Sequence, residues 1–397
     1  MTEQIVKIPL PTLHQAQKEV KNNLKRHSVV ICGRRFGKTM MCIRETAIAA
    51  INGQKVAYIA PNFSTVSYYW KEIQRRLKDL IKTQNTKDHV MELITGGIIY
   101  GFSMEAIANI RGKSLDLVYV DEAGYCNNLE YEFDSAIRPT LIDRKGKSVF
   151  ISTPNGFNDL YNLSERQHKQ KEWTTIQMPT WMNPFMPQEE IESLKESLPS
   201  HIYNAEIGAQ FVDMKQGLFK KDWIEIIPKE DIPKDLAITF GIDLAISKAS
   251  SADYTVIAVL GYNATTNKYY VLAVHRSRMS FDEMKSRIQQ MAEEWNPISI
   301  AMEANSFQRI VAEDLMNNTT LPIVPVYTTT DKYTRALPFA AKMENGYILF
   351  SDSKAVDEEM YNELIQFPNP KLHDDTIDAL GFALNSHSVP KPFIFSI

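Results

Sequence analysis

The chain has 397 residues, of which 44% are hydrophobic and 23% charged. These fractions are close to globular averages and exclude a disordered, collagen-like or coiled-coil chain, while the length predicts roughly two to three domains. The net charge of −4 excludes a general basic coat for nucleic acid, so any contact with DNA must come from local patches.

Cysteine usage and hydropathy predict a soluble intracellular protein. The three cysteines are scattered and form no CxxC pair, which argues against a disulfide framework or a zinc site and favours a reducing compartment. The N-terminal residues, MTEQIVKIPLPTLHQ, lack the apolar segment of a signal peptide. The apolar runs are strand-length, far shorter than the ~20 residues of a membrane span.

The first half alternates apolar, strand-like runs with helical stretches, which predicts an α/β domain. The strands are nearly continuous in Val, Ile and Tyr, as in a mostly parallel sheet with helices on both faces. Ser64 is the expected cap of the second helix. Residues 157–212 are polar and helical and are expected to form a small lid subdomain. The expected strands are 28–33, 56–60, 98–103, 116–121 and 148–152, and the expected helices are 39–51 and 64–81.

The segment GRRFGKT (33–39) lies between an expected strand and an expected helix and is typical of a phosphate-binding loop. Gly37 lets the backbone approach the phosphates, Lys38 can reach the β- and γ-phosphates, and the Thr39 hydroxyl can hold Mg²⁺. The template GxxxxGK[ST] requires glycine at position 32, where Cys32 stands, and Gly33 comes one place late. The flanking strand and helix nevertheless favour an ATP site over a chance GKT.

A second apolar strand, in LDLVYVDEAG (115–124), ends in two carboxylates about 80 residues downstream. The carboxyl ends of parallel strands meet at the ligand crevice, so Asp121 is expected to hold Mg²⁺ and Glu122 to polarise the attacking water. The next strand runs into STPNG, where Thr153 is placed to sense the γ-phosphate; a simple turn is the alternative.

Other polar residues near the predicted loop are weaker candidates. An arginine close to the γ-phosphate can stabilise transition-state charge, which points to Arg34 and Arg35. Arg111 could act likewise across a subunit boundary, or be an ordinary surface arginine. Gln17, before the first strand, could read the adenine edge, or lie on the surface.

The second half restarts with three consecutive strands and continues as helix, strand, helix, strand. This order is that of an RNase H-like nuclease fold. The expected domains are 1–212 and 236–397, joined by a charged linker over 213–235. The expected strands are 237–245, 254–262, 268–276, 298–303, 322–327 and 347–350, and the expected helices are 281–295, one from about 306, and 374–384.

Acidic residues stand at the ends of several of these elements. Carboxylates from two strands and a final helix can converge to bind Mg²⁺ or Mn²⁺, and two such ions can clamp the attacking and leaving oxygens of a phosphodiester. Each acid could instead cap a helix or lie on the surface. The basic segments 275–279, 306–309 and 331–338 could contact the DNA backbone, or be solvated faces. The candidate metal ligands are Asp243, Glu303, Asp374, Asp375 and Asp378, with Asp253 as an outer ligand.

Taken together, the two halves resemble the large terminase subunit of tailed double-stranded DNA bacteriophages. The resemblance covers nearly the whole chain and rests on GRRFGKT, VYVDEAG, STPNG, FGIDLA, MEAN and HDDTIDAL, all in the family's order. The departure at Cys32 is itself typical of the family's variant phosphate loop. The resemblance implies an N-terminal P-loop ATPase that drives DNA into an empty capsid and a C-terminal RNase H-like nuclease that cuts the concatemer.

The resemblance also implies roles for individual residues. Arg34 would be a cis arginine finger and Arg111 a trans finger, Thr153 would belong to the coupling motif, and Gln17 would read adenine. The ATP–Mg²⁺ site would contain Lys38, Thr39, Asp121 and Glu122, and the nuclease metal ligands would be Asp243, Glu303 and Asp375, with Asp374, Asp378 and Asp253 as helpers.

The expected partners follow from the same resemblance. They are double-stranded DNA, the capsid portal protein and the small terminase subunit. The chain would be a homo-oligomeric ring on the portal and a monomer in solution, working in the host cytoplasm and absent from the mature virion. Two alternatives stay open: a helicase–nuclease of DNA repair or recombination, and a non-catalytic nucleotide switch.

Overall fold

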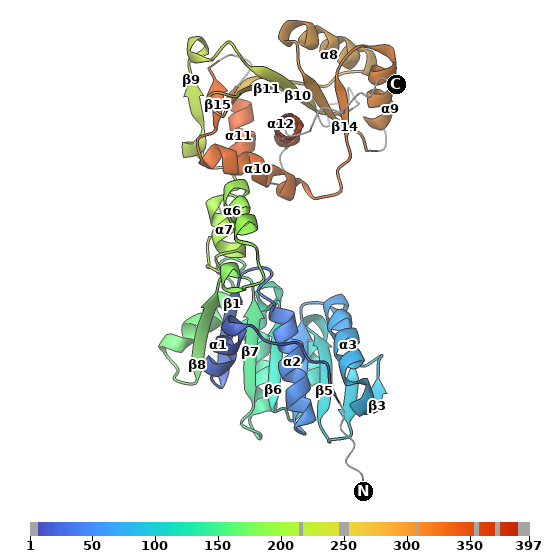
Figure 1. Ribbon diagram of the computed structural model, residues 1–397, viewed down its shortest axis with the longest axis vertical. Coiled ribbons are helices and arrows are strands. Elements are labelled where there is room, and N and C mark those ends of the chain that lie inside the picture. Colours follow the sequence, from blue (N-terminus) through green and yellow to red (C-terminus); the bar gives the residue numbers. More distant parts are fainter. Residues whose placement is uncertain are drawn as a thin grey trace. The chain divides into compact units, whose positions relative to one another are not determined.

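The structure is a computed structural model, and it describes residues 7–213, 217–245, 254–305, 308–352, 357–369 and 374–387. The chain divides into two compact units (Figure 1). One unit comprises Met1–Leu194 and His201–Lys215, and the other Lys195–Ser200 and Gln216–Ile397. We call them the N-terminal and the C-terminal domain.

The N-terminal domain is built on a sheet with eight strands in the described part, in the order β3-β4-β5-β2-β6-β7-β1-β8. From β5 to β8 neighbouring strands are parallel, whereas β3 and β4 form an antiparallel hairpin on β5. The strands are β1 (His27–Cys32), β2 (Lys55–Ala60), β3 (Ile81–Asn85), β4 (Val90–Leu93), β5 (Ile98–Ser103), β6 (Leu117–Asp121), β7 (Lys147–Ser152) and β8 (Trp173–Met178).

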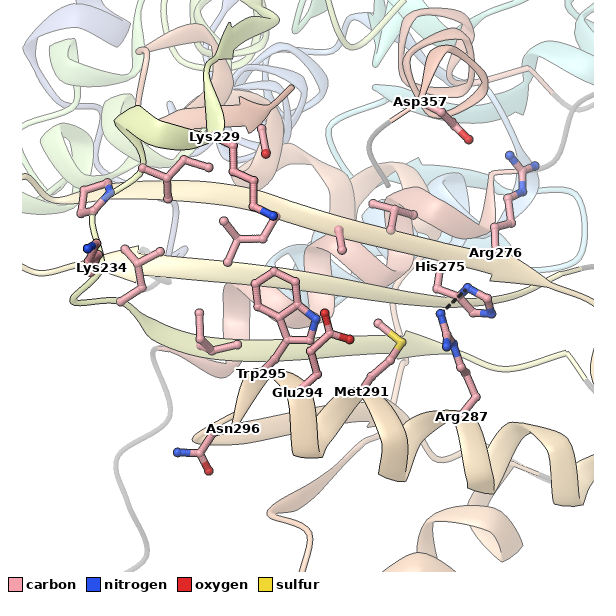
Figure 2. A pocket seen from close by; sticks show the side chains of 18 of the residues that line it. Lys229, Lys234, His275, Arg276, Arg287, Met291, Glu294, Trp295, Asn296 and Asp357 are labelled. Atoms are coloured by element: carbon pink, nitrogen blue, oxygen red, sulfur yellow. Dashed lines mark hydrogen bonds between the residues drawn. The ribbon is translucent and has the colours of Figure 1, made fainter. Parts of the chain in front are cut away.

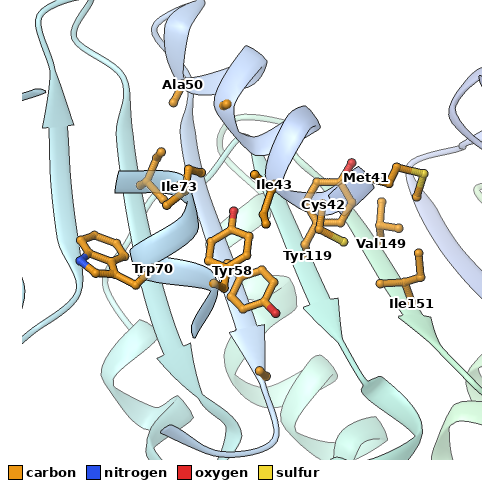
Figure 3. Close-up of a cluster of buried hydrophobic side chains, with 14 of the residues drawn as sticks. Met41, Cys42, Ile43, Ala50, Tyr58, Trp70, Ile73, Tyr119, Val149 and Ile151 are labelled. Atoms are coloured by element: carbon orange, nitrogen blue, oxygen red, sulfur yellow. The ribbon is translucent and has the colours of Figure 1, made fainter. Parts of the chain in front are cut away.

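Helices cover both faces of this sheet because its strands are apolar on both sides. On one face α2 and α3 pack on β2 and β6, and Tyr58, Trp70 and Tyr119 fill the space between them (Figure 3). The ring of Tyr58 stacks on Tyr69 at 3.4 Å between centroids. The helices of this part of the chain are α1 (Gln15–Asn23), α2 (Lys38–Ile51), α3 (Phe63–Leu77), α4 (Leu129–Glu132), α5 (Asp159–Glu165), α6 (Gln188–Ser197) and α7 (Ser200–Glu206).

The segment expected as a helical lid over 157–212 differs from the expectation in its first part. Strand β8 pairs with β1 along its whole length, and Leu160, Leu163 and Trp173 belong to the core of the sheet's second face. Apolar contacts therefore assign 157–178 to the sheet layer, and the helices α6 and α7 come after it. The cap of α3 also differs, because Asn62 rather than Ser64 accepts the hydrogen bond from the backbone N–H of Thr65.

The C-terminal domain contains a seven-stranded mixed sheet in its described part, in the order β14-β13-β10-β11-β12-β15-β9. Strands β10, β11 and β12 are antiparallel neighbours, and parallel strands extend the sheet on both sides. The strands are β9 (Glu225–Ile227), β10 (Ala237–Asp243), β11 (Thr255–Asn263), β12 (Lys268–Ser277), β13 (Ser299–Glu303), β14 (Ile323–Val326) and β15 (Ile348–Ser351).

Two helix layers bury the two faces of this sheet. Helices α8 and α9 cover one face, and α10, α11 and α12 cover the other. Helix α12 lies directly on β10, because Gly241 has no side chain to separate the two backbones. The helices are α8 (Phe281–Trp295), α9 (Gln308–Asn318), α10 (Lys332–Glu344), α11 (Glu358–Gln366) and α12 (Asp375–Ser386).

The described residues contain neither a membrane-spanning helix nor a disulfide. None of their helices has both the length and the apolar character that a membrane span requires. Their three cysteines are free and buried, which leaves them without a disulfide.

Candidate functional site

The loop between β1 and α2 has the backbone of a phosphate cradle. Gly37 adopts a left-handed conformation at φ 94°, which favours glycine, and α2 starts at the next residue. Lys38 is buried, with 8% of its surface exposed. The backbone N–H groups at the N-terminus of α2 and the Lys38 ammonium together form a site suited to phosphate.

Asp121, at the carboxyl end of β6, is fully buried beside this loop. Its carboxylate accepts hydrogen bonds of 2.9 Å from the Thr39 hydroxyl, the Tyr58 hydroxyl and the backbone N–H of Glu122. Burial raises the pKa of Asp121, although these hydrogen bonds and Lys38 oppose the shift. A hydroxyl and a carboxylate side by side are oxygen donors of the kind that Mg²⁺ prefers.

Glu122 occupies a left-handed backbone conformation, with φ 49°, directly after the strand. Burial raises its pKa and Lys38 lowers it, so the two side chains interact. This left-handed conformation ends the strand at the edge of the sheet where the phosphate loop lies.

The loop after β6 is tied to the loop after β7. The backbone N–H of Gly124 donates to the Ser152 hydroxyl at 3.0 Å, and the Gly124 carbonyl accepts from Asn155 and Asn158 at 3.2 and 2.8 Å. Thr153 is buried between these anchors, with 3% of its surface exposed. These hydrogen bonds join the loop that follows Glu122 to the segment that follows β7.

The arginines of the loop face different surroundings. Arg34 forms an ion pair with Glu206 of α7, through its Nε and through an Nη2–Oε1 hydrogen bond of 3.1 Å, and its backbone N–H donates to the Glu206 carbonyl. The Arg34 side chain is 63% exposed. Arg35 adopts φ 62°, and its carbonyl accepts a 2.8 Å hydrogen bond from Asn183.

Gln17 and Arg111 lie on opposite sides of this arrangement. The Gln17 amide donates to the carbonyls of Phe36 and Gly37 at 3.4 and 3.0 Å, so it braces the phosphate loop. Arg111 is exposed and precedes β6, at the opposite edge of the parallel sheet from Asp121. The structure therefore does not bring Arg111 to its own phosphate loop.

The acidic residues of the C-terminal domain converge at the carboxyl ends of β10 and β13 and the N-terminus of α12. Burial raises the pKa of Asp243 well above its usual range; Asp378, Asp375 and Glu303 raise it further, and Lys332 lowers it. The charges of these three carboxyl groups therefore reach Asp243. Glu303 is held by the Thr328 hydroxyl at 2.7 Å and the Asn305 amide at 3.2 Å.

The three aspartates at the start of α12 have different partners. Asp374 contacts the Lys332 ammonium at 2.6 Å. Asp378 is bound by both Lys332, at 3.0 Å, and the guanidinium of Arg335, whose Nη2 lies 2.7 and 2.8 Å from its two oxygens. Asp375 accepts a 3.2 Å hydrogen bond from the backbone N–H of Tyr254, and Lys332 is 3.9 Å away. Asp253 lies outside the described residues.

Lys332 and Arg335 belong to the segment 331–338, in which the sequence indicated contacts with the DNA backbone. In the structure both side chains bind carboxylates of α12 instead. Burial opposes the charge of Lys332, but Asp378 and Asp374 outweigh it and raise its pKa. In the described parts of the chain, no three acidic, histidine or cysteine side chains already stand close enough to hold a metal ion.

A separate cavity of about 920 Å³ lies between β12 and α8 in the C-terminal domain (Figure 2). Trp295 and Met291 of α8 line it with apolar atoms, and Lys229 and Arg287 add charged side chains to its lining. Arg287 contacts the Nδ1 of His275 at 3.3 Å. The cavity could not be predicted from the sequence, because its walls come from elements far apart in the chain.

Several site residues escaped prediction from the sequence. Tyr58 contacts Asp121 from the middle of a buried strand, where nothing in VAYIA marks it. Lys332 and Arg335 lie in the segment 331–338, whose basic residues indicated contact with DNA rather than with carboxylates. Glu206, which binds Arg34, lies in a helix about 170 residues downstream.

Comparisons with known proteins agree on one family. Residues 29–226 match the family model "Terminase large subunit, T4likevirus-type, N-terminal", and residues 240–387 match "Terminase RNaseH-like domain". Both matched models are terminase domains, so the helicase–nuclease alternative has no support.

Individual relatives are distant. The large terminase subunit of Escherichia phage T5 is 26% identical over 261 residues, which cover 62% of this chain and 59% of that protein, so the match spans less than two thirds of its length. That of Thermus virus P23-45 is 22% identical, over 75% of this chain and 67% of that protein. The crystal structure of the large terminase of bacteriophage HK97 matches with a TM-score of 0.43 and 13% identity, covering 95% of this chain and 95% of the HK97 chain.

Proposed function

Because the chain belongs to the large terminase family, we propose that it is the ATP-driven, DNA-cutting subunit of a viral genome-packaging motor. The observation that carries the proposal is the presence of two separate centres in one chain. One has Lys38 and Asp121 at a phosphate loop, and the other has Asp243 among further carboxylates. The first suits nucleotide hydrolysis and the second suits phosphodiester hydrolysis.

At the phosphate loop, Lys38 would neutralise phosphate oxygens, and Thr39 and Asp121 would hold Mg²⁺. When bound, Mg²⁺ offsets the charge that develops on the phosphates. Glu122 orients the attacking water. Arg34, once released from Glu206, is the candidate cis finger, and Arg111 serves the site of the neighbouring subunit. Gln17 supports the phosphate loop through its hydrogen bonds to two backbone carbonyls. It reads the adenine edge only if its amide gives up one of these bonds.

At the carboxylate cluster, Asp243, Glu303 and Asp375 are the proposed ligands for Mg²⁺ or Mn²⁺. The cluster fits a cation, because an ammonium group already lies within it. Bound divalent ions would stabilise the attacking and leaving oxygens of a cut phosphodiester. Asp378 has a different role: its two cationic partners neutralise it, so it positions α10 against α12.

The proposed cycle couples these centres to DNA. Hydrolysis shifts Glu122, the link through Gly124 carries the shift past Thr153, and the segment with α6 and α7 moves the DNA. The working form is a homo-oligomeric ring on the portal in the host cytoplasm, with the small terminase subunit and double-stranded DNA as partners. The ring leaves the capsid before the virion matures.

Separation of the two activities tests the proposal. Glu122→Gln is expected to lower DNA-stimulated ATP turnover about a hundredfold and to leave plasmid cleavage intact, because only water orientation is lost. Asp243→Asn is expected to do the reverse, as measured by phosphate release and by gel analysis of supercoiled plasmid with Mg²⁺ or Mn²⁺. The matched control Glu313→Gln removes an exposed acid of α9. Loss of both activities in either single variant would contradict two independent centres.

A further inference from the structure

The Lys332 side chain lies inside the carboxylate cluster rather than beside it. Its ammonium is 2.6 Å from Asp374, 3.0 Å from Asp378 and 3.9 Å from Asp375. Lys332 is also the cation that acts most strongly on Asp243. One lysine thus serves acids from both α12 and β10, which is the position that a bound metal ion would share.

Helix α10 fixes Lys332 in this place. Lys332 is the first residue of the helix, and the Asp331 side chain caps it by accepting a 2.9 Å hydrogen bond from the backbone N–H of Thr334. One turn further along, Arg335 grips Asp378 through both carboxylate oxygens. These contacts anchor the backbone of the lysine, while the rotatable bonds of its four-carbon stem would let the ammonium move once its ion pairs are broken.

The carboxylates differ in how much they depend on Lys332. Asp378 would still be ion-paired with Arg335 if the Lys332 ammonium moved away. The Asp374 side chain is 34% exposed, so water can solvate its charge. Asp375 is 12% exposed, and its carboxylate contacts the Tyr254 backbone N–H as well as Lys332. Lys332 lies nearest to Asp374 and Asp378, and its charge also acts on Asp375, at 3.9 Å, and on Asp243, which are both proposed metal ligands.

We propose that Lys332 is a resident cation that holds the metal position of the nuclease site until a divalent ion displaces it. The inference rests on the proposed nuclease function. A divalent ion must then displace a positive charge that already occupies the cluster, which weakens metal binding in the absence of DNA. A DNA phosphate near the site would give the displaced ammonium a new anionic partner, so DNA binding and metal binding would favour each other.

Metal binding to the full chain, measured calorimetrically with Mn²⁺ and no DNA, tests the proposal. Lys332→Met keeps most of the length of the side chain and removes its charge, and it is expected to lower the Kd for Mn²⁺ at least about tenfold. Lys332→Gln is the second variant if the Met variant fails to fold. Lys332→Arg retains the charge and is expected to bind as weakly as the wild type. Lys342→Gln, further along α10, is the matched control and should leave the Kd unchanged.

A second measurement adds a short DNA duplex. The duplex should tighten Mn²⁺ binding in the wild type by a larger factor than in Lys332→Met. Equal Kd values in wild type and Lys332→Met would overturn the inference and leave the nuclease proposal standing. If neither protein binds Mn²⁺ at millimolar concentration, the proposed nuclease site is itself wrong, and the inference is overturned with it.

Discussion

Gly33 is the residue at which the variant phosphate loop meets the rest of its domain. A Cβ atom here would lie 2.3 Å from the Thr180 hydroxyl and 2.5 Å from the Ile207 carbonyl. Gly33→Ala is therefore expected to push the backbone at 180 and 207 away from the loop and to lower the free energy of unfolding by about 1–3 kcal/mol. ATP turnover should fall at least about tenfold, because the loop is displaced. Steady-state ATPase assays and urea unfolding measure both effects.

A gentler change at the same contact is the control. Thr180→Val removes the 2.8 Å hydrogen bond to the Arg34 carbonyl and leaves the backbones in place. Thr180→Val is expected to lower the free energy of unfolding by about 1 kcal/mol. Wild-type activity and stability in Gly33→Ala would show that the loop tolerates a side chain here.

Individual site residues could be predicted where the backbone fixes them. Asp121, Asp243 and Glu303 end strands in the structure as they do in the sequence pattern. Carboxyl ends of neighbouring parallel strands meet at one edge, so a run of apolar residues ending in an acid indicates a place in space. Lys332 could not be predicted, because its partners lie about 40 residues away and only packing of α10 on α12 joins them.

Strands, too, could be predicted where the local sequence pattern is strong and not where they depend on contacts with distant residues. Strands rich in Val and Ile, such as β1, β6 and β11, were predicted to within a residue or two. Strand β3, IKTQN, is mostly exposed, and β8, WTTIQM, lies in a polar stretch, so neither carries the apolar run of a buried strand. Pairing with a neighbour, rather than composition, makes them strands.

The packing of α12 on β10 offers a test at the level of elements. A Cβ on Gly241 would lie 1.8 Å from the Ala379 carbonyl oxygen and 2.4 Å from the Ala383 nitrogen. Gly241→Ala must lift the helix from the strand and carry Asp375 away from Asp243. We expect about 3 kcal/mol of destabilisation and loss of plasmid cleavage, with ATP turnover retained.

The control lies on the same helix. Among the described residues outside the backbone of its own helix turns, the Arg335 carbonyl is the one group within 4 Å of a Cβ built on Gly381, at 3.8 Å. Gly381→Ala is expected to stabilise α12 by about 0.5–1 kcal/mol through helix propensity and to keep cleavage. Denaturant unfolding of both variants measures the difference. Normal cleavage by Gly241→Ala would refute close helix–strand contact as the device that sets the carboxylate spacing.

At the scale of the whole molecule, each domain contains a histidine whose pKa is lowered to about 4, which should make stability depend on pH. His27 is 2% exposed, contacts the Ser148 hydroxyl at 2.8 Å, and packs beside Trp173. His387 contacts the Thr239 hydroxyl at 2.8 Å. Burial lowers the pKa of each to about 4 from 6.5, and Arg26 also lowers that of His27.

The sign of the effect follows from proton binding. Below pH 6.5 the unfolded chain protonates these histidines, whereas the folded chain does so only near pH 4, so stability present above pH 6.5 is lost as the pH falls. At pH 5 the loss is about 2 kcal/mol for each histidine. In urea unfolding at pH 7 and pH 5, His27→Gln should reduce the pH dependence of the N-terminal domain by this amount. His168→Gln, which replaces an exposed histidine, should keep the wild-type pH dependence, and an unchanged slope in His27→Gln would refute the assignment.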